Sequence, residues 1–215
     1  MASKHAAAAP VAGKPDTRKK LMRSALRLFV EKGYHRTTTD QISRAAGVSA
    51  GALYVHFRSK EDLALTLFKQ LTEDAAEGVP EAVDGARNTE ERIRALTAHL
   101  FEWCEAHREE AIFLILLRHA EIFTTRPEIT GSRHNLARLL DEAIARGQQD
   151  GEIPQTDPRL LRKVSGILIV FVRDRLEGWY DGDLRDDIEA AACMCCAALR
   201  APVGNEASPG SSPAS

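Results

Sequence analysis

Apolar residues recur along most of the chain at the three- and four-residue spacing of amphipathic helices. In the first such segment, residues 16–32, the apolar stripe comprises Leu21, Ala25, Leu28 and Phe29. Gly33 follows where the C-cap of that helix is expected. No stretch alternates apolar and polar residues for long enough to indicate a strand, and glycine and proline fall between the helical segments. The pattern therefore predicts an all-α fold.

Short capped helices are predicted after the first one. Thr38 is expected to cap a second helix in a capping box with Gln41, and that helix ends at Gly47. Its inward residues are expected to be Ile42, Ala45 and Ala46. Ser49 is expected to cap a third helix through about residue 55, and Ser59 a fourth, with Asp62 at the matching position.

Longer helices are predicted at 89–106, 108–125, 133–147, 158–180 and 184–200, separated by breaks at 78–85, 125–131 and 147–158. Residues 1–15 are rich in Ala, Pro, Gly and Lys, and residues 202–215 in Pro, Gly, Ser and Ala. Segments of this composition bury too little apolar surface to fold, so we expect a disordered arm and a disordered tail.

Charge is distributed unevenly along the chain. Residues 1–60 contain 12 Lys or Arg against 3 Asp or Glu, whereas the other residues contain 17 against 28, although the net charge is only −2. A basic head on an acidic body indicates a polyanionic partner, and a solvated basic tail is the alternative. The longest apolar runs, 111–117 and 167–172, fall far short of the ~20 residues of a membrane span. Three of the four cysteines crowd together at 193–196, which does not indicate a disulfide framework and favours a reducing cytoplasm.

The segment 33–57 contains the strongest functional signal. Two short helices are separated by Ala46-Gly47-Val48-Ser49, as in a helix-turn-helix whose second helix enters the major groove of double-stranded DNA. Small side chains at Ala50, Gly51 and Ala52 allow close approach of the backbone to DNA, and Tyr54, His56 and Lys60 offer donors to phosphate. Taken singly, each of these residues fits a packing or surface role equally well, and the indication comes from the ordered set.

The ordered set also resembles the signature of TetR-family regulators. The matching positions are Thr37-Thr38, Ile42, Ala45-Ala46-Gly47-Val48-Ser49, Gly51, Leu53-Tyr54, His56-Phe57, Lys60 and Leu63. The resemblance implies an N-terminal three-helix DNA-binding domain, here 16–60, joined to a larger helical ligand-binding and dimerisation domain, here 61–201. It further implies that Thr37, Thr38, Ser49, Tyr54, His56 and Lys60 position the DNA backbone, with Ala50, Gly51 and Ala52 at the groove floor. Since Ala and Gly side chains cannot hydrogen-bond a base, more of the sequence discrimination is expected from Arg44, Tyr54, DNA shape or a basic arm in a minor groove. The basic arm comprises Lys14, Arg18, Lys19, Lys20 and Arg23.

The larger domain is expected to hold a small-molecule effector of unknown identity. A pocket needs apolar walls with a few polar groups, and one helical stretch supplies Trp103, Cys104, His107, Phe113, Leu117, His119 and Phe123. The alternative is that the apolar residues are ordinary core and the polar ones face water. In the family the last two helices pair with those of a second copy, and 158–180 and 184–200 are suited to such a homodimer.

Enzymatic and metal-dependent functions find little support. The sequence contains no His-Glu-x-x-His pair, no phosphate-binding glycine loop and no Gly-x-Ser-x-Gly motif, and we expect no cofactor. Cys193 and Cys196 share a helix face but lack further ligands, so packing is the better interpretation. The sequence predicts a ligand-responsive repressor that releases a pseudo-palindromic operator. A ligand-independent architectural or nucleoid-associated DNA-binding protein is the alternative.

Overall fold

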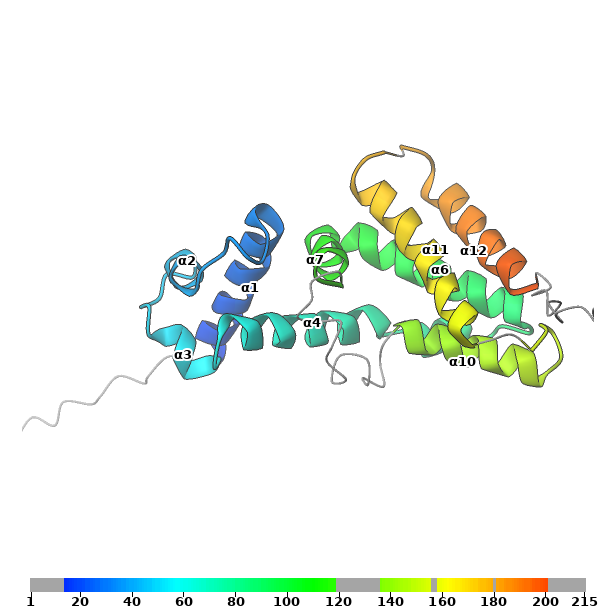
Figure 1. Cartoon of the computed structure of the whole chain (residues 1–215), viewed down its shortest axis with the longest axis horizontal. Helices are drawn as coiled ribbons and strands as arrows, with labels where there is room; N and C mark the ends of the chain where they lie inside the picture. The colour runs from blue at the N-terminus through cyan, green and yellow to red at the C-terminus, as the bar shows by residue number, and fades with distance from the viewer. Residues whose placement is uncertain (1–13, 119–135, 156–157, 180, 201–215) are drawn as a thin grey trace, which may run out of the picture. The chain divides into compact units, whose positions relative to one another are not determined.

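A computed structural model describes residues 14–118, 136–155, 158–179 and 181–200, and these residues form helices joined by turns and short loops (Figure 1). The helices are α1 (Lys14–Lys32), α2 (Thr39–Ala45), α3 (Ala52–His56), α4 (Lys60–Ala76), α5 (Val79–Asp84), α6 (Thr89–Ala106), α7 (Arg108–Arg118), α10 (Leu136–Gln149), α11 (Pro158–Leu176) and α12 (Leu184–Arg200). The predicted all-α fold is confirmed. The parts of the predicted helices at 119–125 and 133–135 lie outside the described residues.

The chain divides into two compact units. The N-terminal unit contains the described residues up to Leu71 together with α7 from Glu109 onwards. The C-terminal unit contains residues 72–108 and the described residues from α10 onwards. The sequence predicts a boundary at residue 60, where α4 starts, whereas the N-terminal unit extends to Leu71, because apolar residues of α4 from Leu63 to Leu71 belong to the N-terminal core.

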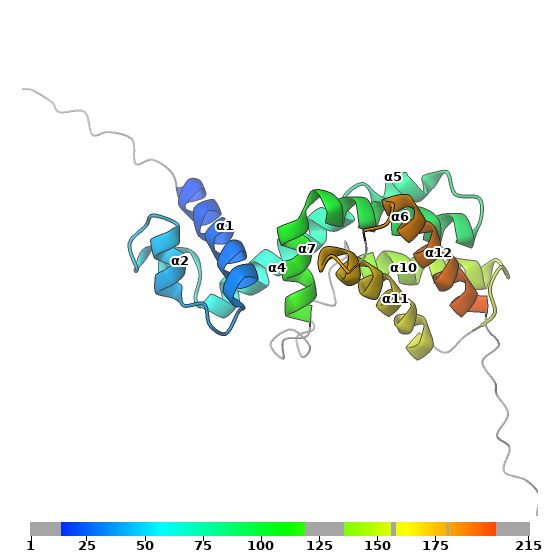
Figure 2. The same ribbon diagram turned by 90° about the horizontal axis from the view of Figure 1, so that it is seen from above.

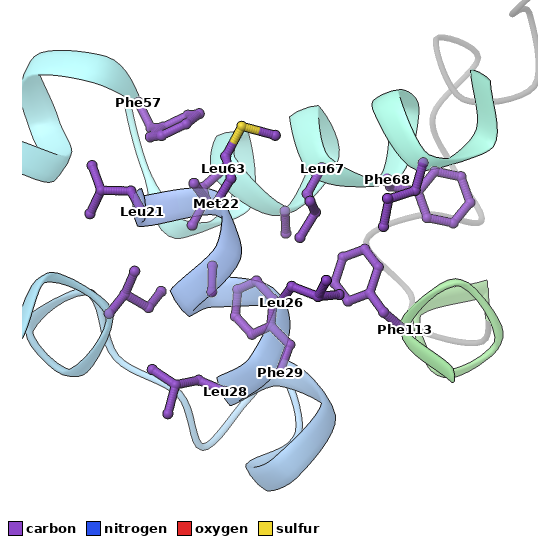
Figure 3. Close-up of a cluster of buried hydrophobic side chains, with 14 of the residues drawn as sticks. Leu21, Met22, Leu26, Leu28, Phe29, Phe57, Leu63, Leu67, Phe68 and Phe113 are labelled. Atoms are coloured by element: carbon purple, nitrogen blue, oxygen red, sulfur yellow. The ribbon is translucent and has the colours of Figure 1, made fainter. Parts of the chain in front are cut away.

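The N-terminal core is a continuous apolar cluster (Figure 3). α1 contributes the stripe expected from the sequence, with Leu21 and Ala25 inaccessible to solvent. α2 and α3 each contribute one fully buried side chain, Ile42 and Leu53. α7 adds Phe113, whose ring stacks on Phe29 of α1 at a centroid distance of 5.9 Å. The core therefore joins helices that are more than 80 residues apart in sequence.

The local signals for α2 and its turns are largely confirmed. Thr38 and Gln41 form the predicted capping box, and Gly33 and Gly47 adopt positive φ values of 80° and 67°. Two predictions in this segment are wrong. The N-cap of α3 is Gly51, which has no side-chain hydrogen bond, because Ser49-Ala50-Gly51 forms a turn before the helix begins. Ala45 is exposed and Ser43 is buried instead, because Ser43 adjoins Ile42 on the inward side of this short helix.

In the C-terminal unit α6 packs against α5, α10, α11 and α12 (Figures 1 and 2). Residues 78–85, predicted as a break, contain α5, because Gly78 reverses the chain at φ 82° and Pro80 suits the first turn of a new helix. α11 ends at Leu176 rather than near residue 180. Gly178, two residues after the helix end, adopts φ 74°. Among the described residues, we find no helix with the length and apolar character needed to cross a membrane.

Candidate nucleic-acid interface

Helices α2 and α3 are held together by one buried contact and one exposed contact. Ile42 and Leu53 pack into the N-terminal core and are inaccessible to solvent. On the outside, the hydroxyls of Thr39 and Tyr54 lie 3.2 Å apart and share a hydrogen bond. Because α3 has only five residues, it has little stability of its own, and these contacts fix its direction.

Most of the predicted DNA-binding residues are accessible. Tyr54 is 59% exposed although its hydroxyl contacts Thr39. The other exposed members of the predicted set are Thr38, Arg44, Ser49, Ala50 and Gly51, and Ala52 and His56 are half-buried. The side chains that are free to meet DNA are thus small or polar, with Arg44 as the exposed cation in the predicted set.

Thr37 belongs to the interior. Its side chain is inaccessible to solvent, and its hydroxyl donates to the carbonyl oxygens of Leu28 at 3.1 Å and Gly33 at 2.9 Å. The hydroxyl thereby ties the start of the α2 segment to the end of α1. Thr37 consequently contributes to an interface through the position of the backbone around it.

Lys60 forms a clamp between α4 and the turn after α1. Its Nζ donates to the carbonyl oxygens of Tyr34 and Thr37, both at 2.9 Å, and lies 4.2 Å from the centroid of the Tyr34 ring. Loss of hydration around the ammonium group lowers the pKa of Lys60. Two of its three donors are therefore used within the protein, which leaves one for an external oxygen.

Two accessible residues were not among the predicted contacts. Val55 on α3 is 71% exposed, which is unusual for a β-branched apolar side chain on a short helix. Thr39 holds the Tyr54 hydroxyl in place. Helical spacing contains a signal for Val55, since Leu53 and Phe57 are the buried positions and residue 55 lies between them, away from the core.

The residues predicted to line an effector pocket are dispersed. Phe113 is 1% exposed and belongs to the N-terminal core. In the C-terminal unit, Cys104 is buried beside a cavity of about 10 Å³, Trp103 is half-buried, and the exposed His107 ring lies 5.0 Å from the Trp103 ring. The side chain of Leu117, and His119 and Phe123 altogether, lie outside the described residues.

Packing accounts for two of the three clustered cysteines, and the packing prediction is wrong for Cys193 within this chain. Cys195 and Cys196 are buried, whereas Cys193 is exposed. Burial raises the pKa of the Cys195 thiol to about 12, which keeps it protonated. Within the part of the chain that the structure describes, no three His, Cys, Asp or Glu side chains are placed to share a metal ion.

The clamp at Lys60 generates a prediction about stability. Lys60→Met removes two charge-assisted hydrogen bonds but keeps the apolar stem, so we expect the free energy of unfolding to fall by about 1–3 kcal/mol. Urea titration followed by circular dichroism measures this change. Lys69→Met is the matched control, since Lys69 is exposed on the same helix. Equal stability of the two variants would show that the clamp contributes nothing.

Comparisons with known proteins agree with this geometry. Residues 21–67 match the family described as bacterial regulatory proteins, tetR family. The fatty acid metabolism regulator protein of Bacillus subtilis (strain 168) is 25% identical over 168 residues, which cover 78% of this chain and 85% of that protein. The HTH-type transcriptional repressor KstR2 of Rhodococcus jostii (strain RHA1) is 31% identical over 143 residues, covering 65% and 69% respectively.

The fold also matches solved structures. The crystal structure of a transcriptional regulator FadR from Bacillus subtilis in complex with stearoyl-CoA superposes with a TM-score of 0.67 at 21% identity, covering 84% of this chain and 98% of that one. A resemblance at this identity shows a common fold. Together with the matched helix-turn-helix segment and the 31% identical repressor, it establishes that this chain belongs to the TetR family and is a DNA-binding transcriptional regulator.

Proposed function

We propose that the chain is a homodimeric repressor that binds a pseudo-palindromic operator and releases it when a small molecule binds the C-terminal unit. The exposed surface of α2 and α3 is the observation that carries the proposal, because it combines accessible donors with small side chains on a rigid base. In this proposal the DNA phosphates are contacted by Thr38, Ser49, Tyr54 and His56. The one donor of Lys60 that is not used within the protein is directed to a further phosphate. Ala50, Gly51 and Ala52 face the floor of the major groove, and Arg44 and the basic arm add sequence discrimination.

Val55 is the strongest candidate for an apolar contact with a base. Leu53 and Phe57 occupy the buried side of α3, so Val55 lies on the side that would face the groove. A major groove presents the C5-methyl group of thymine, and an aliphatic side chain recognises it by excluding water. We therefore assign Val55 a part in reading a T·A pair.

The Val55 assignment leads to a test on DNA. Replacing the contacted thymine by deoxyuridine removes one methyl group, which is worth about 0.8 kcal/mol or about fourfold in Kd. We expect this loss for the wild-type protein and its absence for Val55→Ala, measured by fluorescence anisotropy on a site selected from random DNA. Deoxyuridine outside the bound site is the control. An unchanged penalty in the variant would assign the contact to another residue.

Dimerisation is proposed to occur through α12, with α11 beside it. The outward face of α12 lacks charge over two turns and comprises Ala190, Cys193, Met194, Ala197 and Ala198, all exposed. Met194 is 51% exposed and Val170 on α11 is 45% exposed. Small residues allow close approach of a second helix, and burial of this face stabilises a dimer. Two heads are required to meet half-sites about 34–36 Å apart, or a multiple of that spacing.

Cys193 reports on this dimer. Burial raises the pKa of Cys104 and of Cys195 to about 12, so these thiols should react slowly with Ellman's reagent. We expect Cys193 to be protected in the native dimer and to react rapidly in Ala197→Arg, which places a charge in the proposed interface. The coloured product of Ellman's reagent is followed at 412 nm. The mass of the protein in the same solution is measured by light scattering.

The matched control for that variant is Ala145→Arg, which introduces the same charge at an exposed alanine of α10. We expect this variant to remain a dimer with a protected Cys193. A wild-type dimer in which Cys193 reacts at once would place the interface on another face. Cys193→Ser confirms which thiol gives the signal.

Effector control is proposed to reach the DNA-binding surface through α7. α7 from Glu109 belongs to the N-terminal unit, whereas α6 and Arg108 belong to the C-terminal unit. The Phe113 ring stacks on Phe29, and α1 contacts both α2 and α3. A ligand that displaces the start of α7 would thus disturb the core that positions both reading helices. Ligand and DNA need only favour different states for each to weaken the binding of the other.

Fatty acyl-CoA is the effector class to test first, because one relative is named a fatty acid metabolism regulator and another was solved with stearoyl-CoA. We expect the dimer to bind a selected operator with a Kd that rises steeply with salt, and stearoyl-CoA to weaken binding between about 5- and 150-fold. Free CoA is the control that lacks the acyl chain. These affinities are measured by fluorescence anisotropy.

Two outcomes would contradict the proposal. Absence of double-stranded DNA binding in dilute buffer would remove its basis. Many weak sites, with no response to acyl-CoA or to a wider collection of metabolites, would favour the architectural or nucleoid-associated alternative.

A further inference from the structure

A cavity of about 180 Å³ lies between α5, α6 and α10 in the C-terminal unit. Most of its wall is aliphatic and includes Val79, Leu96, Leu139 and Ala143. The volume is below the ~300–1,000 Å³ of pockets that hold drug-sized ligands. An occupant must therefore be small and have an apolar part.

The same cavity is lined by Arg92, a cation that is 7% exposed. Among the residues that the structure describes, its Nη1 is buried without a hydrogen-bond partner. Buried guanidinium groups are normally paired and hydrogen-bonded, because removing the charge from water costs several kcal/mol. Arg92 thus lines the cavity and has one nitrogen, Nη1, without an acceptor.

Glu152 is the acidic group nearest to that nitrogen, and it is engaged elsewhere. Its Oε2 lies 3.9 Å from Arg92 Nη1, which is too far for a hydrogen bond. The same oxygen accepts from both the backbone nitrogen and the hydroxyl of Thr89. Hydrogen bonds from Thr89 are the main reason that the pKa of Glu152 is lowered, and the charge of Arg92 contributes less.

The position of Glu152 is fixed by close packing. A Cβ added at Gly147 would lie 2.1 Å from the Thr89 hydroxyl oxygen, so the end of α10 touches the start of α6. The backbone nitrogen of Glu152 donates to the Gly147 carbonyl at 2.9 Å. Glu152 is therefore held on Thr89, and a closer approach to Arg92 would break those hydrogen bonds.

Two more charged side chains line the cavity. Arg146 is a second cation, 3.8 Å from Asp150, and Glu142 pairs with Arg138 at 2.8 Å on the exposed face of α10. With Arg92, the lining therefore has two positive charges and one negative charge. Asp150 beside Arg146 and Glu152 beside Arg92 offset these charges, so the preference for a single carboxylate rests on the one nitrogen of Arg92 that has no acceptor.

We propose that the cavity binds a short aliphatic monocarboxylate, with its carboxylate accepting from Arg92 and its chain against Val79, Leu96, Leu139 and Ala143. Arg146 adds attraction for the anion at the cavity wall. This site goes beyond the proposed function, because a cavity of about 180 Å³ is too small for the acyl-CoA effector proposed there. The ligand supplies the oxygen that Arg92 lacks in the unliganded protein.

Hexanoate is the probe, and hexanamide is the uncharged control of the same length. Binding of each compound to the full chain is measured by calorimetry at matched ionic strength. We expect hexanoate to bind at least tenfold more tightly than hexanamide. Arg92→Met should abolish this preference and leave the unliganded Tm unchanged or raised, because a buried cation that is 3.9 Å from its acid and lacks a hydrogen bond at Nη1 is replaced by an apolar group of similar length.

Two further variants separate a binding role from a structural one. Arg138→Met removes a charge from an exposed position of α10 outside the lining, so hexanoate binding should persist. Ala143→Leu fills the cavity while Arg92 remains, and it should weaken hexanoate binding at least tenfold. Hexanoate binding that is absent in the wild type, or unchanged in Arg92→Met or Ala143→Leu, would overturn the proposal. A marked fall in the unliganded Tm of Arg92→Met would do so as well, because it would assign Arg92 to the pair with Glu152.

Discussion

Burial of one side chain from each short helix, Ile42 from α2 and Leu53 from α3, is the constraint on which the DNA-binding surface depends. Helices of seven and five residues do not persist alone, because nucleation costs more than a few hydrogen bonds return. Packing of both side chains on α1 and α4 gives α2 and α3 their mutual angle and leaves Tyr54 and Val55 outside. Phe113 completes the same core from α7, so the proposed DNA-binding surface shares its core with a helix that follows α6 directly in the sequence.

Two polar side chains, Thr37 and Lys60, fix the backbone of the turn beside the apolar core. The Thr37 hydroxyl and the Lys60 ammonium group both satisfy carbonyl oxygens around the turn after α1, and such groups would otherwise be desolvated without partners. Residues of the family signature therefore divide into those that build the surface and those that are exposed on it. Under the proposed function, a substitution at Thr37 would act on DNA affinity through the shape of the head, one at Lys60 through both that shape and its free donor, and one at Val55 or Arg44 through the contact itself.

Charged residues have different roles in the C-terminal unit. Arg175 bonds Asp187 and Glu105 and so joins α11, α12 and α6 with its charge neutralised. Arg92 is more deeply buried but has no acceptor at Nη1, because Thr89 and the tight packing at Gly147 hold Glu152 in place, 3.9 Å away. The contrast between an arginine that hydrogen-bonds two acids and one whose Nη1 has no acceptor distinguishes a structural network from a candidate binding site.

Sequence alone determined the features that depend on near neighbours. The helical periodicity, the Thr38–Gln41 capping box and the positive φ of Gly33 and Gly47 all arise within a few residues, and the ordered signature from Thr37 to Leu63 identified the family. Tertiary structure alone decided which residues turn inward. Thr37 and Lys60 have the same polar character as exposed contacts, and their direction depends on carbonyl partners up to 26 residues away. Phe113 was predicted to line the effector pocket because apolar side chains form pocket walls. It packs on Phe29 instead, because the fold brings the two rings together, and no local sequence pattern encodes that contact.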